Sequence, residues 1–280
     1  MCPLSFLSGV GDYEQKNGYL CNMKLSFNIE YRAPFGQSLH VNIAYMGSDG
    51  HTRLQNLPMH TDDGVNWLLE TTSVSFPHVE IVYMAYSYQV EDDNGKVMRR
   101  EWNGVPRLYA SDCTKDFIFL DKWRDISVQH YIYRWLKRPA AVLRNIPYFD
   151  KSVIFRVSAP QVESGFSVAL LGGEPTLGRW NVQRYLTMYY VGDGDWMLSI
   201  NAYAVALPLE YKYVVVDDST HHVVEWERGM NRSIGPLKLE SGQQIVAYGG
   251  NIRTQCRLIC HDDFFNKDYV INHEIRELYI

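Results

Sequence analysis

The chain has 280 residues, of which 46% are hydrophobic and 21% are charged, so it can form a packed core and is not globally disordered. Its net charge of −5 leaves no excess of basic side chains to neutralise phosphates, which argues against a nucleic-acid partner. No apolar run approaches the ~20 residues that span a bilayer, so we expect no membrane partner. Aromatic residues make up 14% of the chain, and they can fill a β-rich core or provide flat surfaces for a ligand.

Residues 1–22 lack the basic region and apolar core of a secretory signal, and we expect them to form a loose extension. From residue 23 onward, apolar residues alternate with polar ones, first at Leu25, Phe27 and Ile29. This period of two is typical of strands with one buried face. It predicts a first β-sandwich domain over residues 23–123.

The segment 124–150 breaks this pattern. Val128, Ile132 and Leu136 fall at helical spacing, and Pro139 interrupts the helix that they predict. We therefore expect a short helical linker here.

The alternation returns at residue 151 and predicts a second β-sandwich domain over residues 151–252, followed by a C-terminal tail at 253–280. Many short strands separated by polar turns favour an all-β chain with two immunoglobulin-like antiparallel β-sandwich domains.

The two halves repeat one hairpin unit. Tyr211 follows Tyr86 by 125 residues, each before an Asp-Asp turn, and Trp226 follows Trp102 by 124 residues, each after a Glu. The copies therefore differ by one insertion or deletion, and they predict an array of two similar domains.

Five cysteines at irregular spacings argue against a disulfide framework. Cys256, Cys260 and His261 could form half of a metal site, but no second pair stands at ligand spacing. We expect reduced thiols in a cytoplasmic protein, with no metal and no cofactor.

An enzymatic function has little support in the sequence. The adjacent carboxylates of Asp92-Asp93 and Asp217-Asp218 fall in predicted turns, where solvation explains them. No phosphate-binding loop, dinucleotide fingerprint or nucleophile elbow is present. We therefore predict no catalytic residues in this chain.

The second half carries an ordered set of motifs: Leu171-Gly-Gly, Leu177-Gly-Arg-Trp180, Trp196, Tyr211-Lys-Tyr213, Trp226-Glu227 and Asn231-Arg232. This order resembles the starch-binding domain, carbohydrate-binding module family 20. Two such domains in tandem are similar to the N-terminal part of the disproportionating-enzyme-2 type of 4-α-glucanotransferases, which are amylomaltases. No segment after Tyr248 resembles their catalytic barrel, which would need ~250 residues.

The resemblance implies a principal glucan site made of Trp180, Lys212, Trp226, Glu227 and Asn231, and it places Tyr190 at a possible second site. The chemistry of these residue types agrees: indole rings stack on the C–H face of a sugar, and two rings from separate segments form a bent platform for a curved α-1,4-glucan. Lys212 can donate hydrogen bonds, Glu227 can accept them and Asn231 can do both.

Structural roles compete with these functional ones. Trp196, Tyr211 and Tyr213 sit at alternating positions that predict burial. On the residues alone, Trp180 and Trp226 fit a structural role as well as a sugar-stacking role.

The first half departs from the family pattern. It has no Leu-Gly-x-Trp, Ser87 stands at the position of Lys212, and Asn103 follows Trp102 where Glu is expected. We expect this domain to bind glucan weakly through a residual site at Trp102, or to serve as a structural partner.

The sequence therefore predicts non-catalytic binding of starch-like or glycogen-like α-1,4-glucan or maltooligosaccharide, which targets a 4-α-glucanotransferase to polysaccharide. The alternative is a module that docks on a glucanotransferase catalytic domain or on a second copy of itself, with a vestigial sugar site.

Overall fold

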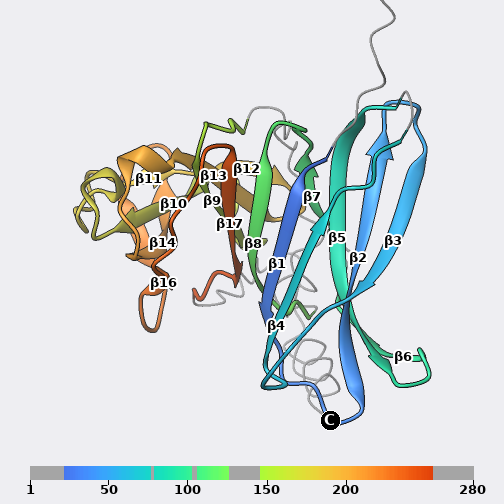
Figure 1. Cartoon of the computed structure of the whole chain (residues 1–280). Coiled ribbons are helices and arrows are strands. Elements are labelled where there is room, and N and C mark those ends of the chain that lie inside the picture. The colour runs from blue at the N-terminus through green and yellow to red at the C-terminus, as the bar shows by residue number, and fades with distance from the viewer. Residues whose placement is uncertain (1–21, 77–78, 103–105, 126–145, 255–280) are drawn as a thin grey trace, which may run out of the picture.

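The computed structural model of the chain describes residues 22–76, 79–102, 106–125 and 146–254 (Figure 1). Strands dominate these residues, with 3₁₀ turns at Pro175–Leu177 and Ala202–Ala204. Most of the predicted helical linker, the N-terminal extension and the segment from Cys256 to His261 lie outside the described residues. Among the described residues, no helix is long and apolar enough to cross a membrane.

The strands form three sheets. A seven-stranded sheet has the order β12-β13-β9-β17-β8-β1-β4. Its strands are β12 (Tyr189–Gly192), β13 (Asp195–Asn201), β9 (Ser152–Ser158), β17 (Gln243–Asn251), β8 (Asp116–Lys122), β1 (Lys24–Glu30) and β4 (Asn66–Thr72).

Each of the other two sheets has five strands. The first contains β3 (Thr52–Pro58), β2 (Gln37–Gly47), β5 (Ile81–Asp92), β6 (Val97–Arg100) and β7 (Arg107–Ala110). The second contains β11 (Leu186–Thr187), β10 (Phe166–Gly172), β14 (Leu209–Asp217), β15 (Val223–Trp226) and β16 (Arg232–Ile234).

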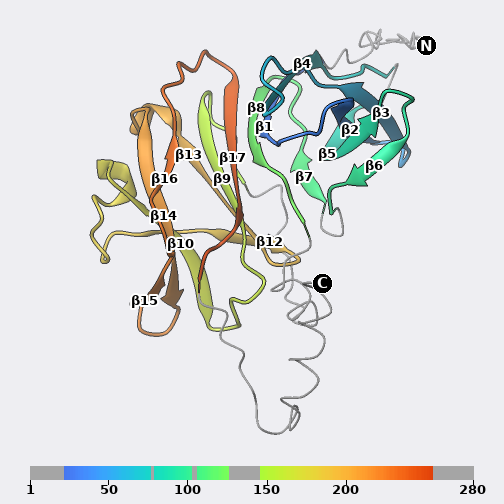
Figure 2. The ribbon, with the colours of Figure 1, turned by 90° about the horizontal axis from the view of Figure 1, so that it is seen from below.

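The seven-stranded sheet lies between the two five-stranded sheets (Figures 1 and 2). All seven residues of β9 are buried: Val153 and Phe155 pack in the core of the second repeat, whereas Ile154 packs in the core of the first. Alternate side chains of one strand therefore contribute to two different cores.

The chain forms two structural repeats, β1–β8 and β9–β17, with matching connections. The first and last strands of each repeat pair in parallel, β1 with β8 and β9 with β17, while the remaining pairs within a repeat are antiparallel. β8 also pairs in parallel with β17, so the central sheet is continuous across the repeats. Local periodicity gives no signal for this long-range pairing.

A buried arginine reinforces the junction. Arg156 on β9 donates to the carbonyl oxygens of Leu108 at 3.1 Å and Pro106 at 3.2 Å in the first repeat, and it pairs with Asp195 at 2.6 Å. Its guanidinium lies 5.0 Å from the ring centre of Tyr109. Since a buried charge without its partners costs several kcal/mol, these contacts favour one mutual arrangement of the repeats.

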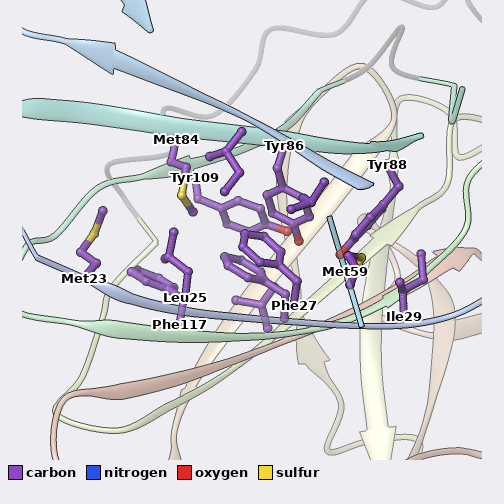
Figure 3. Close-up of a cluster of buried hydrophobic side chains, with 14 of the residues drawn as sticks. Met23, Leu25, Phe27, Ile29, Met59, Met84, Tyr86, Tyr88, Tyr109 and Phe117 are labelled. Carbon is purple, nitrogen blue, oxygen red and sulfur yellow. The ribbon is translucent and has the colours of Figure 1, made fainter. Parts of the chain in front are cut away.

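Most of the aromatic excess is ordinary core. Phe27 and Tyr86 lie together in the first core (Figure 3), with their ring centres 4.9 Å apart. The ring centre of Phe119 lies 5.0 Å from that of Phe27. Trp196 is 3% exposed, which confirms its predicted burial, and Trp67 is 5% exposed.

The expectation that the cysteines are reduced is wrong for Cys113, which is disulfide-bonded. The other four cysteines lie outside the described residues. Because disulfides persist in oxidising compartments, cysteine usage gives no support for a reducing one. An odd number of cysteines rules out the pairing of all five within one chain, but it still allows one disulfide bond. The prediction from the cysteine count failed because it did not consider that case.

Candidate functional site

The outer face of the second five-stranded sheet collects the predicted residues. Trp226 on β15 stands opposite Val214 on β14, and Lys212 precedes Val214 by two positions. Because side chains alternate between the faces of a strand, these three share one face, while Tyr211 and Tyr213 point into the core. Both tyrosines are buried, as the sequence predicted.

A tight turn brings Trp180 to the same face. Leu177 ends the 3₁₀ turn, and Gly178, Arg179 and Trp180 follow with φ angles of +83°, +50° and +61°. The backbone N–H of Trp180 donates to the carbonyl oxygen of Gly172 at 2.9 Å. Two consecutive non-glycine residues in the left-handed region cost about 1–3 kcal/mol each. Such a conformation persists only where the surrounding structure holds it.

Gly178 makes this turn possible. A Cβ atom at this position would lie 2.4 Å from the carbonyl oxygen of Arg184, closer than any normal contact. The Leu-Gly-x-Trp motif therefore specifies the backbone path that delivers Trp180.

The two tryptophans lie on the sheet in different ways. Trp180 is half-buried and packs against an outer-face cluster that includes Ala169, Leu171 and Val214. Trp226 is 38% exposed. One ring is therefore anchored by packing and the other is more open to solvent, and both leave part of their surface available to a ligand.

Polar groups lie beside these rings. Lys212 Nζ donates to the carbonyl oxygens of Glu227 at 3.1 Å and Gly229 at 2.6 Å. Since an ammonium carries three donors, this leaves one for a ligand among the contacts of the described residues. Asn231 is exposed and its Nδ2 donates to Glu210 Oε2 at 3.0 Å, which leaves its amide oxygen as an acceptor. We call Trp180, Lys212, Trp226 and Asn231 the outer-face site.

Glu227, the fifth residue predicted for the site, has another role. Its carboxylate is buried. It accepts hydrogen bonds from the Arg232 guanidinium at 2.5–3.1 Å and from Arg253 N and Nε at 3.1 and 3.0 Å. Its prediction as a direct sugar acceptor is therefore wrong. Because its backbone carbonyl accepts from Lys212, Glu227 is a positioning residue.

The electrostatics of Glu227 agree with this role. Burial raises the pKa of its carboxyl group, but hydrogen bonds from Arg232 and Arg253 outweigh that effect and leave the pKa below its usual value. The group is therefore ionised at neutral pH and holds both arginines.

Tyr190, predicted at a second site, is half-buried and makes structural contacts. Its hydroxyl accepts from the backbone N–H of Gly194 at 3.1 Å, and its ring meets Trp196 edge-on at 5.3 Å. Its neighbour Tyr189 is 51% exposed. The more open ring at this strand therefore belongs to Tyr189.

The first repeat contains the same buried ion pair. Arg107 is fully buried, donates to Glu101 Oε1 at 2.6 Å and also lies near Asp121. The backbone N–H of Glu101 bonds to Tyr88 O, as that of Glu227 bonds to Tyr213 O. Glu101 is therefore the counterpart of Glu227.

This correspondence corrects the alignment of Trp102 with Trp226. Arg100 stands opposite Gln89 on β5, just as Trp226 stands opposite Val214 on β14, so Arg100 occupies the Trp226 position. The N–H of Trp102 donates to Arg124 O, as that of Arg228 donates to Arg253 O. Trp102 is half-buried against the Arg124 guanidinium, 5.4 Å from the ring centre, and it is not a remnant of a sugar platform.

Sequence reasoning missed Arg253 and Arg124, which both donate to the buried carboxylates. Arg253 pairs with Glu227 through its guanidinium, and Arg124 donates its backbone N–H to Glu101 Oε1 at 2.8 Å. Each arginine follows the last strand of its repeat, and this shared position is the sequence signal that could have revealed the two contacts.

Comparisons with known proteins find a family model that matches the second repeat. Residues 150–245 match the model of the family CBM_20, described as a starch binding domain. A curated relative, the 4-alpha-glucanotransferase DPE2 of Oryza sativa subsp. japonica, is 25% identical over 233 residues. These cover 76% of this chain and 24% of the relative. The chain therefore spans about a quarter of that relative's length.

Solved structures with similarity include a family 20 carbohydrate-binding module of a maltotetraose-forming amylase from Pseudomonas saccharophila STB07. It is 23% identical, with a TM-score of 0.27, and the match covers 35% of this chain and 98% of that one. A glucoamylase from Hypocrea jecorina is 20% identical, with a TM-score of 0.30, over 37% of this chain and 18% of the other. These TM-scores are low and carry no argument. The match to the starch binding domain model falls on the second repeat, which also carries the outer-face site.

Proposed function

We propose that the second repeat binds an α-1,4-glucan through the outer-face site, and that the module directs an attached 4-α-glucanotransferase to starch-like or glycogen-like polysaccharide. The family match and the relative support the ligand class and the attached activity. This chain supplies binding, and the chemistry belongs to a partner domain.

The observation that carries the proposal is the strained turn at Trp180. The backbone holds Arg179 and Trp180 at positive φ, and the Trp180 ring packs on the sheet face that also carries Trp226. Strain of this kind is concentrated at ligand sites, where the surrounding fold compensates for it. A purely structural tryptophan needs no such turn.

The chemistry then follows from the residue types. The two rings offer apolar faces to the C–H surface of successive glucose units. Lys212 and Asn231 can bind the hydroxyl groups at the rim. Because the site is open and the ligand is flexible, we expect a dissociation constant on the order of micromolar to millimolar.

Calorimetric titration with β-cyclodextrin tests the proposal. We expect wild-type protein to bind, and Trp180→Ala and Trp226→Ala each to weaken binding at least about tenfold, which corresponds to 1.4 kcal/mol. Phe35→Ala is the matched control, because Phe35 is fully exposed in the first repeat, and it should bind as wild type does.

Absence of binding by folded wild-type protein would overturn the proposal and favour a docking or dimerisation role instead. Wild-type affinity in both tryptophan variants would overturn the assignment of the site.

A further inference from the structure

A groove opens where the two repeats separate. β8 and β17 pair from Asp116 and Gln243 as far as Leu120 and Ala247. Beyond that point β8 stays with β1, while β17 stays with β9. A cavity of about 580 Å³ lies along this divergence, between β16 of the second repeat and β1, β4 and β8 of the first. We call it the inter-repeat groove.

The wall formed by the first repeat is the sheet face opposite its hydrophobic core. Phe27 and Ile29 of β1 point into the core, so the alternating Asn28 faces the groove. Asn66 of β4 and Lys122 of β8 line the same wall. The opposite wall presents Asn231 and Ser233.

The charges of the groove nearly balance. Glu30 stands beside Lys122 in the register of β1 and β8, and Arg232 and Arg253 share the one carboxylate of Glu227, which leaves one positive charge among these five side chains. What remains is neutral amide and hydroxyl groups next to the apolar side chain of Leu68, which is 41% exposed. This combination suits a neutral ligand with many hydroxyl groups.

Several polar atoms along the groove have unused capacity. Asn28 Nδ2 donates to Ser26 Oγ and Phe119 O, and Asn66 Nδ2 donates to Asp63 Oδ2. Within the described part of the chain, neither amide oxygen accepts a hydrogen bond. Asn251 Oδ1, on a third lining residue, is buried without a partner among the described residues. Polar atoms in such positions are usually satisfied by water or a ligand.

The groove meets the outer-face site at Asn231. Lys212 Nζ holds Gly229 O at 2.6 Å on the side of the outer-face site. Asn231, two residues further along the chain, belongs to the outer-face site and also lines the groove. A glucan chain that extends from the outer-face site past Asn231 would therefore reach the groove.

We propose that the inter-repeat groove is an extended binding site for the same glucan chain, in which Asn28, Asn66 and Lys122 of the first repeat contact glucose units beyond those held by Trp180 and Trp226. This inference rests on the proposed function of the outer-face site. The first repeat thus contributes through its inner-sheet surface, although its own outer face lacks the tryptophans.

The length of the glucan ligand distinguishes binding at the outer-face site from binding in the groove. β-Cyclodextrin is a closed ring and can use only the outer-face site, whereas a linear maltooligosaccharide of about twelve units can continue into the groove. We expect wild-type protein to bind the linear chain roughly three- to tenfold more tightly than the ring, as one or two added hydrogen bonds would give.

The double variant Asn66→Ala/Lys122→Ala should abolish this preference for the linear chain while it keeps β-cyclodextrin binding unchanged. Asn94→Ala/Lys96→Ala is the matched control, because both residues are exposed in the β5–β6 turn, and it should keep the preference. Ser233→Trp, which fills the groove from its other wall, should reproduce the loss.

Equal affinity of wild-type protein for ring and chain would overturn the inference, as would an undiminished preference in the groove variants. Failure of wild-type protein to bind β-cyclodextrin would instead refute the proposed function itself, so the two failures are distinguishable.

Discussion

The two repeats share a scaffold and differ in one surface. Each anchors the strand after its hairpin with a buried carboxylate and arginine, Glu101 with Arg107 and Glu227 with Arg232. On the outer sheet face, however, Arg100 and Ser87 occupy the positions of Trp226 and Lys212. The buried pair is therefore common to both repeats, and the tryptophans are specific to the repeat for which we propose glucan binding.

The segments that pack on the outer sheet face also differ between the two repeats. In the second repeat, the turn that carries Trp180 packs on Leu171 and Val214. In the first repeat, the corresponding face carries a hollow of about 620 Å³ that Asn42, Asn56 and Ser87 line. Asn42 and Asn56 bond to each other there, and Asn56 also donates to Glu91. A surface whose amides satisfy one another is suited to water, and we expect no strong glucan binding on it.

Removal of the shared carboxylates should have the largest effect. Glu227→Ala leaves Arg232 without its carboxylate partner, and Glu101→Ala leaves Arg107 with only the more distant carboxylate of Asp121, at 3.6 Å, among the described residues; the loss of a buried partner costs about 3–5 kcal/mol. Denaturant unfolding should show losses of this size for both variants. Losses below about 1 kcal/mol for either would contradict the role that we assign to the pair.

Replacement of a glycine should cost more stability in the turn at Trp180 than in an ordinary turn. Gly178→Ala creates a contact with Arg184 O at 2.4 Å, whereas Gly50→Ala at a similar φ of +77° meets nothing within 4 Å. We expect Gly178→Ala to lose about 1–3 kcal/mol of stability and to weaken β-cyclodextrin binding. Gly50→Ala should lose less stability and bind normally. Identical behaviour of the two variants in unfolding and titration would argue against a strained, functional turn.

Acid should affect the second repeat through Glu227. Since the pKa of Glu227 is lowered in the folded state, its stabilising contribution is present above the pKa of the unfolded chain, about 4.3, and is lost as the pH falls through the folded value. Glu227→Gln should flatten the decline of the unfolding midpoint below about pH 4.5. The same decline in variant and wild type would show that other carboxylates control it.

Transfer of the site to the first repeat should have the smallest effect. In a Trp226→Ala background, Ser87→Lys/Arg100→Trp places a lysine and one indole on the first outer face. Without a counterpart of Trp180, we expect at most binding in the millimolar range by calorimetry. Micromolar affinity would show that one tryptophan suffices.

Much of the fold was predictable from alternation and turns. The alternation of Leu25, Phe27 and Ile29 with polar residues predicts a strand, and this prediction does not depend on which strand lies next to it. The pairing of β8 with β17 was not predictable, because period-two patterns specify buried faces and not neighbours.

The site was predictable where a motif determines the local backbone, as at Gly178 and Trp180. The match of Trp102 with Trp226 failed because the hairpin turns differ in length. Asp92 N bonds to Lys96 O in the first repeat, whereas Asp217 N bonds to His222 O in the second, and His221 takes up the extra residue at φ +58°. The burial of Glu227 escaped prediction because one sequence does not show which arginine folds back onto it.

The most direct test of the account replaces Trp226 with the residue that the first repeat uses at that position. Trp226→Arg copies Arg100 onto the second outer face and leaves the buried pair of Glu227 and Arg232 intact. We predict a normally folded protein, by thermal unfolding, that gives no measurable heat with β-cyclodextrin at concentrations that saturate wild-type protein. Wild-type affinity in folded Trp226→Arg would contradict the claim that this residue distinguishes the binding repeat from its partner.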